Sequence, residues 1–241
     1  MTTTPAELNP IVAHDGSRVA YTVTEHAQST AWVVATSGGT PHRLCDGCAA
    51  MAWLADSRHV LVVSRPGGTM VRAVSLDDGK AAPVLPPEVG SGRLYPSWDG
   101  RWLAFMLQGQ GSLWIAPLRP GAPAARAEWR PIDVFGPGPR DKSAIGGERP
   151  VGWSPDGRLL YLLLEPDGSR CLHAVRIDPA RGVASGEPFP VHHFHDPQRR
   201  LSSTPFGSGI VKDAFIYDQF ETTASIWLLD PTPAATSARL E

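Results

Sequence analysis

The chain has 241 residues, of which 42% are apolar and 19% are charged, so a folded core is expected and a disordered chain is excluded. Basic and acidic residues nearly balance, at 22 against 24. This balance, without a long run of either sign, argues against a nucleic-acid-binding protein.

The 24 glycines and 24 prolines are spread along the whole chain and indicate many turns between many short elements. No stretch approaches the roughly 18 apolar residues that suggest a membrane-spanning helix. The N-terminal segment 1–7 lacks the basic and apolar regions of a signal peptide. We therefore expect no membrane span and no export signal in this chain, and the sequence leaves the cellular compartment open.

Five turns built around an aspartate are each followed at once by an apolar run. The turns are His14–Arg18, Ala55–His59, Trp98–Arg101, Ser154–Arg158 and a degenerate copy at Val211–Asp213, and the runs are Val19–Tyr21, Val60–Val63, Trp102–Phe105, Leu159–Tyr161 and Ala214–Tyr217. Asp-Gly suits a turn because glycine tolerates a positive φ and the aspartate side chain can bond the backbone two residues on. The aspartates are separated by 41, 43, 57 and 57 residues.

Each copy contains a second apolar run after a further polar or glycine-containing turn. These runs are Ala31–Val34, Val71–Val74, Leu113–Ala116, Leu172–Val175 and Ile226–Leu229. Their side chains favour a pleated, buried surface, and the runs are too short and too continuously apolar for amphipathic helices. A repeat of about 40 to 45 residues with several strands is typical of a β-propeller blade, whose sheet is buried on both faces.

The sequence therefore predicts an all-β fold, a β-propeller of about five four-stranded blades. We expect one domain over residues 1–241, with repeats at approximately 9–48, 49–90, 91–150, 151–200 and 201–230. The alternative is a β-sandwich with regularly spaced hairpins.

The run Val151–Tyr161, with its core Trp153-Ser154-Pro155-Asp156-Gly157, closely resembles the repeat signature of TolB-like β-propellers. Asn9–Tyr21 is similar with histidine in place of the proline, and Tyr95–Phe105 is similar with tryptophan there. The second copy, at Trp53–Ser57, departs further, and the fifth has lost the Ser-Pro pair. The resemblance implies the fold over nearly the whole chain, but a fold of this kind hosts many activities.

Three C-terminal segments resemble the last blades of propellers in large bacterial regulators, where the propeller follows a serine/threonine kinase or a winged-helix domain. They are Arg176–Pro179, Gly186–His195 and Ala224–Asp230. The sequence contains no glycine-rich phosphate loop, no His-Arg-Asp catalytic loop and no Asp-Phe-Gly motif, so kinase activity does not carry over.

The two ends of the chain suggest two ways in which the ring is completed. The N-terminal segment Thr2–Pro5 resembles the end of an outer strand, and the last repeat stops near Asp230 after its third strand. One hypothesis is that the N-terminal segment completes the fifth blade and removes a bare sheet edge. The other is that the chain is part of a larger propeller.

Cys45 and Cys48 form a Cys-x-x-Cys pair, which suits zinc or a redox disulfide. Structural zinc needs four ligands and the chain has no second pair, while redox pairs normally open a helix. The expected role is a loop pair, free or bridged, that tightens the turn between two blades.

His192, His193 and His195 lie close together in the chain. In a strand His193 and His195 share a face and His192 points the other way. Two imidazoles and the carboxylate of Asp196 make a poor metal site without a third ligand from elsewhere. The expected role is therefore that of polar residues on an exposed outer strand or loop, and we expect no metal and no cofactor.

The nucleophile elbow of αβ-hydrolases, Gly-x-Ser-x-Gly, has only poor counterparts around Ser154 and Ser208. Six of the eight tryptophans recur at repeat positions and are expected to pack between blades. They are Trp53, Trp98 and Trp153 near the turns, and Trp32, Trp114 and Trp227 in the later strands. The longest insertion, Arg119–Pro150, is the expected place for a partner contact because loops of this length are often functional.

The function expected from these features is that of a non-enzymatic TolB-like propeller that senses a ligand or binds a protein or peptide. A small molecule at the central mouth of the ring is a further possible ligand. The alternatives are a propeller accessory to a hydrolase or peptidase on another chain, and a truncated fragment of a larger regulator. No catalytic, binding or metal-binding residue can be assigned from the sequence.

Overall fold

The structure is a computed structural model, and it describes residues 6–64, 70–87, 91–107, 113–132, 149–165, 169–196, 199–201, 208–211, 214–217 and 219–221. Twenty strands and one short 3-10 helix, η1 (Arg126–Glu128), account for the regular structure of this part of the chain. No helix within these residues is long and apolar enough to cross a membrane.

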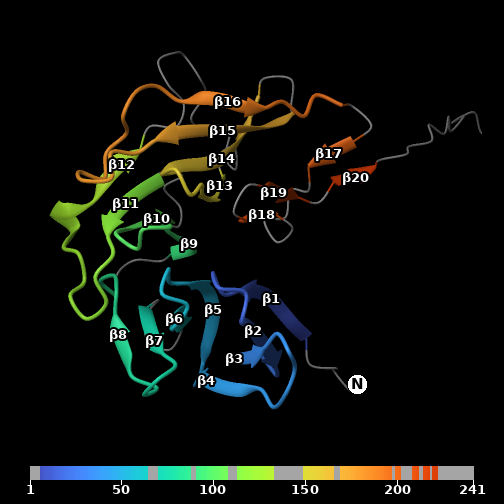
Figure 1. Cartoon of the computed structure of the whole chain (residues 1–241), viewed down its shortest axis with the longest axis vertical. Coiled ribbons are helices and arrows are strands. Elements are labelled where there is room, and N and C mark those ends of the chain that lie inside the picture. The colour runs from blue at the N-terminus through green and yellow to red at the C-terminus, as the bar shows by residue number, and fades with distance from the viewer. Residues whose placement is uncertain are drawn as a thin grey trace, which may run out of the picture.

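Sixteen of the strands form four antiparallel sheets of four strands each, arranged as the blades of a β-propeller (Figure 1). Within each blade the strands pair in chain order. The first blade is β1 (Ala6–Val12), β2 (Arg18–Glu25), β3 (Gln28–Ala35) and β4 (His42–Asp46); the second is β5 (Cys48–Trp53), β6 (His59–Ser64), β7 (Met70–Ser75) and β8 (Ala81–Pro83). The third is β9 (Ser91–Pro96), β10 (Trp102–Leu107), β11 (Leu113–Pro117) and β12 (Arg130–Ile132); the fourth is β13 (Arg149–Trp153), β14 (Arg158–Leu164), β15 (Arg170–Arg176) and β16 (Phe189–His192).

The turn between the first two strands of each blade repeats the same backbone geometry. The residue that follows the aspartate has a positive φ: it is Gly16, Gly100 or Gly157 in three of the blades, and Ser57 takes the same conformation in the second blade. In all four turns the amide of this residue donates to the carbonyl three residues earlier, at 2.9 to 3.0 Å. The aspartate before it caps the turn, and the sequence-based prediction of positive φ at these positions is confirmed.

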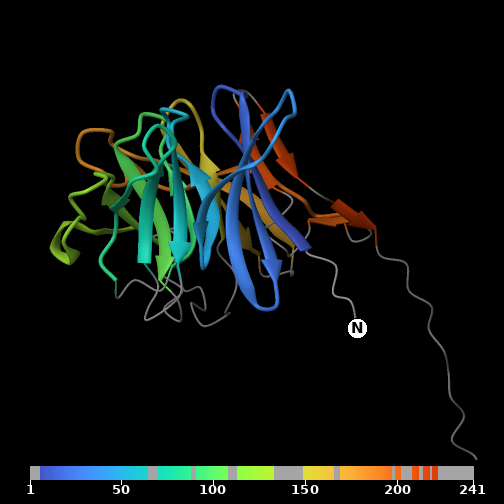
Figure 2. The same cartoon turned by 90° about the horizontal axis from the view of Figure 1, so that it is seen from below.

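The hydrophobic core lies between the blades, in four seams (Figure 2, where the sheets stand face to face). The seam of blades one and two contains Ala20, Val33 and Val60, and that of blades two and three contains Leu61 and Phe105. Neighbouring residues of one strand therefore point into different seams. The second, third and fourth blades contribute residues to a seam on each side, whereas the first blade contributes to one seam. The runs within β6, β10 and β14 are apolar without interruption, as the sequence analysis predicted for strands buried on both faces.

The outermost strands are short and partly exposed, and three of them contain proline: Pro83 in β8, Pro131 in β12 and Pro190 in β16. Proline lacks the amide hydrogen that a further strand would need, so it suits an outer edge and protects the blade from added strands.

The fifth repeat is described in part, as the pairs β17 (Arg199–Leu201) with β20 (Gln219–Glu221) and β18 (Ser208–Val211) with β19 (Ala214–Tyr217). The two pairs form two separate two-stranded sheets. The predicted fifth four-stranded blade is therefore not confirmed, because the described residues show four complete blades and these two strand pairs. The predicted run Ile226–Leu229 lies outside the described residues.

The first strands of the repeats line the inside of the arc, where β1 contacts β5, β5 contacts β9, β9 contacts β13 and β13 contacts β18. No comparable contact between described strands joins the fifth repeat to the first blade. The segment Thr2–Pro5, which carries the hypothesis of N-terminal closure, lies outside the described residues. A single domain over residues 1–241, with or without closure, therefore stays a prediction.

Candidate functional site

A cavity of about 280 Å³ opens between the third and fourth blades, at the face of the propeller that carries the aspartate turns. Three tryptophans, Trp98, Trp102 and Trp153, form much of its wall. The other lining residues are Ser97, Asp99, Ser154, Pro155, Asp156, Gly157, Ile177 and Pro179. A mainly apolar wall with a few polar groups is the usual composition of a ligand pocket, and the volume suits one side chain or a small ligand.

The tryptophan walls are fixed by hydrogen bonds to the backbone. Trp98 donates its indole N–H to the carbonyl of Trp153 at 2.6 Å, and Trp153 donates to the carbonyl of Tyr95 at 2.9 Å. Trp102 donates to the carbonyl of Pro179 at 3.0 Å. The first two bonds join the third and fourth blades in both directions, so the cavity wall is already ordered before any ligand arrives.

The two aspartates at the cavity are engaged within their own turns. Asp156 accepts hydrogen bonds from Arg158 at 2.9 Å and from the Ser154 hydroxyl, and these donors lower the pKa of its carboxyl. Asp99 accepts the Ser97 hydroxyl at 2.6 Å and faces the Arg101 guanidinium at 3.7 Å. Because each carboxylate already faces an arginine, the cavity is not primarily a site for a cation.

The centre of this face is crossed by an aromatic contact between the first and third blades. The rings of His14 and Trp98 meet edge to face, with centroids 4.8 Å apart. Desolvation of the His14 ring lowers its pKa, against an opposing hydrogen bond with the Trp53 backbone. The described cavity is lined by residues of the third and fourth blades, and a ligand at the central mouth of the ring stays a prediction.

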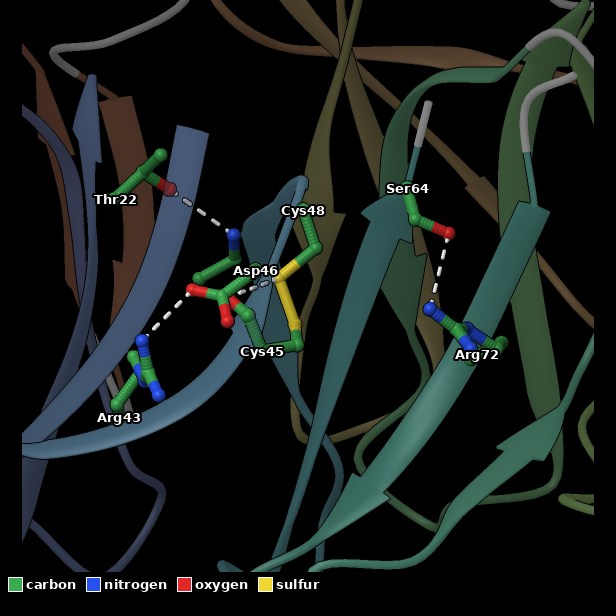
Figure 3. The surroundings of a disulfide bond; sticks show 8 residues. Thr22, Arg43, Cys45, Asp46, Cys48, Ser64 and Arg72 are labelled. Carbon is green, nitrogen blue, oxygen red and sulfur yellow. Dashed lines mark hydrogen bonds and ion pairs between the residues drawn. A yellow bond between two sulfur atoms is a disulfide. The ribbon is translucent and has the colours of Figure 1, made fainter. Parts of the chain in front are cut away.

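Cys45 and Cys48 are joined by a disulfide that links β4, the outer strand of the first blade, to β5, the inner strand of the second (Figure 3). Gly47, with φ of 65°, makes the turn between them. Cys48 is 1% exposed and lies in the seam of these two blades. Both sulfurs are used in this bond, which matches the bridged form of the expected inter-blade loop pair.

The histidine run follows β16, and His193 and His195 point to the same side, as the sequence analysis expected. Their ring nitrogens lie with the sulfur of Cys171, on β15, in a group whose three atoms are all within 4.8 Å of one another. His192 instead packs on Phe194, with centroids 4.5 Å apart. Cys171 is the third ligand-type residue that the sequence analysis could not place.

The remaining sequence candidates are not brought together by the structure. Ser154 holds the fourth turn and Ser208 begins strand β18, so neither sits on a strand–turn–helix elbow. The insertion at 119–150 is in part structured, because it contains η1 and the outer strand β12. Residues 133–148 of this insertion lie outside the described residues, and the expected partner contact stays a prediction.

The tryptophans confirm packing between blades only in part. Trp53 and Trp153 end the inner strands β5 and β13, are 3% and 4% exposed, and each donates to a carbonyl of the preceding blade. Trp98 belongs to the turn itself, two positions later in the repeat than Trp53 and Trp153. Trp227 lies outside the described residues, and Trp129 is a buried residue that the repeat pattern did not single out.

These features define an all-β propeller. The sequence matches no protein-family model and no curated protein. Among solved structures the fold is similar to a TolB from Acinetobacter baumannii, with a TM-score of 0.58 and 10% identity, covering 92% of this chain and 53% of that one. It is also similar to a putative TolB from Agrobacterium tumefaciens, with a TM-score of 0.53 and 18% identity, covering 76% of this chain and 64% of that one.

An acylaminoacyl peptidase is a third similar structure, with a TM-score of 0.54 and 12% identity, covering 88% of this chain and 41% of the peptidase. The chain thus spans less than two thirds of each of these proteins. At such identities the likeness shows the β-propeller fold alone, and the neighbours include both TolB and an enzyme. The kinase or winged-helix context that the sequence resemblance implied stays a prediction.

Proposed function

We propose that this chain is a non-enzymatic, TolB-like propeller domain that binds a segment of another protein. The cavity between the third and fourth blades would receive an apolar or proline side chain of that segment. The carrying observation is the three-tryptophan wall at an accessible face, with each indole held by a hydrogen bond to the backbone. Aromatic-lined grooves of this kind suit extended or proline-rich peptides.

The chemistry of the cavity supports a peptide over a charged small molecule. Its carboxylates at Asp99 and Asp156 face Arg101 and Arg158, so an incoming charge of either sign meets a group that is already paired. The resemblance to propellers of bacterial regulators supports a sensing role for such binding.

The test is selection of peptides from a displayed random library on the purified chain, followed by titration of the selected peptide. Intrinsic tryptophan fluorescence is the readout because three indoles line the cavity. We expect Trp102→Ala and Trp98→Ala to weaken binding by at least about tenfold, as is common for aromatic residues at the centre of an interface.

Trp32→Ala is the matched control, since Trp32 is also half-buried but lies on β3 of the first blade. It should bind the peptide as the native chain does. Equal affinity of the native chain and both cavity variants would refute the proposed site, and so would an equal loss in the Trp32 variant.

A further inference from the structure

A second group of residues with recognisable chemistry lies away from the cavity, on the fourth blade. Cys171 is the second residue of β15, where it pairs in register with Leu163 of β14, and its side chain is fully buried. His193 and His195 follow β16 and are exposed. A buried sulfur is thus covered by two imidazoles that reach solvent.

The distances within this group suit a shared metal ion. The Cys171 sulfur is 3.2 Å from Nε2 of His195, and that nitrogen is 3.2 Å from Nδ1 of His193. Around a tetrahedral zinc ion, bond lengths of about 2.05 and 2.3 Å separate two nitrogens by about 3.4 Å and a nitrogen from a sulfur by about 3.6 Å. The third pair, the Cys171 sulfur and the His193 ring nitrogen, lies within 4.8 Å. An ion therefore fits between the three atoms once the side chains move to bring this last pair closer.

The position of the two histidines is set by the residue between them. Phe194 is 7% exposed and packs into the seam between the fourth blade and the fifth repeat. Its burial turns His193 and His195 to the opposite side, towards Cys171. The burial of Phe194 therefore anchors the segment that carries His193 and His195. Their ring nitrogens lie near the Cys171 sulfur without a bound metal.

A neighbouring pair supports one of the imidazoles. The His193 ring packs edge-on to His173, with centroids 6.4 Å apart, and Nε2 of His173 lies 3.0 Å from Oε1 of Glu165. The His173 and Glu165 side chains are only 10% and 14% exposed. The His173 and Glu165 side chains thus border the His193 ring on the fourth blade.

We propose that Cys171, His193 and His195 form a zinc-binding site that opens to solvent. One thiolate and two neutral imidazoles are ligands that zinc prefers. The described residues supply three ligands, and a water molecule would take the fourth position, as in exchangeable or catalytic zinc sites. Binding releases the thiol proton to solvent and changes no oxidation state.

The first experiment is titration of the purified, tag-free chain with Co²⁺, used as a spectroscopic probe for Zn²⁺, without a reducing agent. With the Cys45–Cys48 disulfide intact, Cys171 is the only thiol among the three cysteines. We expect one equivalent of Co²⁺ to give the near-ultraviolet thiolate-to-cobalt band and the visible bands of a four-coordinate ion. Addition of Zn²⁺ should remove both.

Variants assign the site. His193→Gln and His195→Gln should each weaken binding by at least about tenfold, and Cys171→Ala should abolish the thiolate band. The matched control is His192→Gln, an exposed histidine of the same run whose ring packs on Phe194. It should bind Co²⁺ as the native chain does. A Cys45→Ser/Cys48→Ser double variant should keep the band.

The two histidine variants keep the test decisive if replacement of the buried Cys171 prevents folding, because their side chains are exposed. In addition, Zn²⁺ should raise the melting temperature of the native chain and not that of His195→Gln. The proposal is overturned if the native chain gives no thiolate band, if His192→Gln weakens binding as much as His193→Gln, or if the double variant loses the band. The contacts at 3.2 Å would then be hydrogen bonds alone.

Discussion

At the scale of single residues, the repeated aspartate is the clearest determinant of the fold. Asp15 accepts hydrogen bonds from the Ser17 amide at 2.9 Å and the Ser17 hydroxyl at 2.7 Å. Asp156 accepts bonds from Arg158 and Ser154 in the equivalent turn. These donors favour the ionised carboxylate, so both aspartates have a folded-state pKa below the ordinary value of 3.8.

The lowered pKa values predict that the chain loses stability in acid. A carboxyl that is more acidic in the folded state binds fewer protons there, so its stabilisation is present above about pH 4 and is lost as pH falls through the folded-state pKa. We expect the urea midpoint to drop between pH 5 and pH 3. The double variant Asp15→Asn/Asp156→Asn should start from a lower midpoint at pH 5 and show a smaller drop. An equal drop in both proteins would contradict the assignment.

One residue shows how the repeat tolerates a departure from its pattern. Ser57 replaces the turn glycine of the second blade and still takes a φ of 54°, a conformation that is costly for most residues with a side chain. Its hydroxyl accepts the amide of Asp15 from the first blade at 3.1 Å. The residue with the unfavourable φ thus also makes a hydrogen bond between the turns of the first and second blades. Substitution of Ser57 by glycine would remove this hydrogen bond.

At the scale of elements, the connection between β15 and β16 holds one wall of the cavity. Gly182, with φ of 64°, lies so close to the Trp102 ring that a Cβ would overlap it. Gly186, in the same connection, has φ of 88° and open space around it. Alanine substitutions at the two glycines therefore separate two contributions to the free energy of unfolding, that of the positive φ and that of the overlap with the Trp102 ring.

We expect Gly186→Ala to cost about 1–2 kcal/mol, the penalty for a left-handed conformation. Gly182→Ala should cost at least about 1 kcal/mol more, because the ring of Trp102 must move. The measurement is the free energy of unfolding in urea, with the fluorescence of the folded state as a report on Trp102. Equal costs for the two variants would show that Trp102 is not packed on Gly182.

The strands differ in how far the sequence predicts them. The second and third strands of each blade were predicted from the two apolar runs that follow the aspartate turn, and the structure places strands at each of these runs within the four blades. The first strands β1, β5, β9 and β13 were not located by such runs. The outer strands β4, β8, β12 and β16 were not located individually. They are short, exposed and partly proline-containing, so their sequences look like loops, and only pairing with the third strand defines them.

The candidate sites depend on contacts between residues that are distant in the sequence, and sequence patterns do not show such contacts. That His193 and His195 share a face follows from the alternation of side chains along an extended segment. Cys171 lies near them only because β15 pairs with β16, and this pairing includes a register shift between Leu172 and His173. The cavity likewise needs two blades, since Trp98 and Trp153 are distant in the chain. The repeat unit could be predicted from the sequence, whereas the side-chain contacts between units could not.

At the scale of the whole molecule, the seams predict cooperative unfolding. The second, third and fourth blades each contribute to the cores on both of their sides, so a loss in one seam exposes the faces of two blades. Nearest-neighbour coupling of this kind links the stability of successive repeats. We therefore expect one unfolding transition for the four complete blades.

Leu159, which is fully buried in the seam of the third and fourth blades, provides the test. Leu159→Ala should lower the free energy of unfolding by about 2–5 kcal/mol, and the single transition should shift as a whole. Val191→Ala, at a side chain that is 43% exposed on β16, should change stability by less than about 0.5 kcal/mol. Separate transitions by circular dichroism and by tryptophan fluorescence would contradict the seam model.

The seams also fix the order of the blades along the chain. The first seam combines small side chains such as Ala20, Ala31 and Ala50, whereas the second combines Leu61 with Phe105 and Trp129. The second blade therefore carries two unlike faces, one packed on the first blade and the other on the third. A shuffled chain with the second and third blades exchanged would keep every turn, every strand and the same composition. It would nevertheless set large side chains against large ones and leave voids elsewhere, so the repeats are not interchangeable parts.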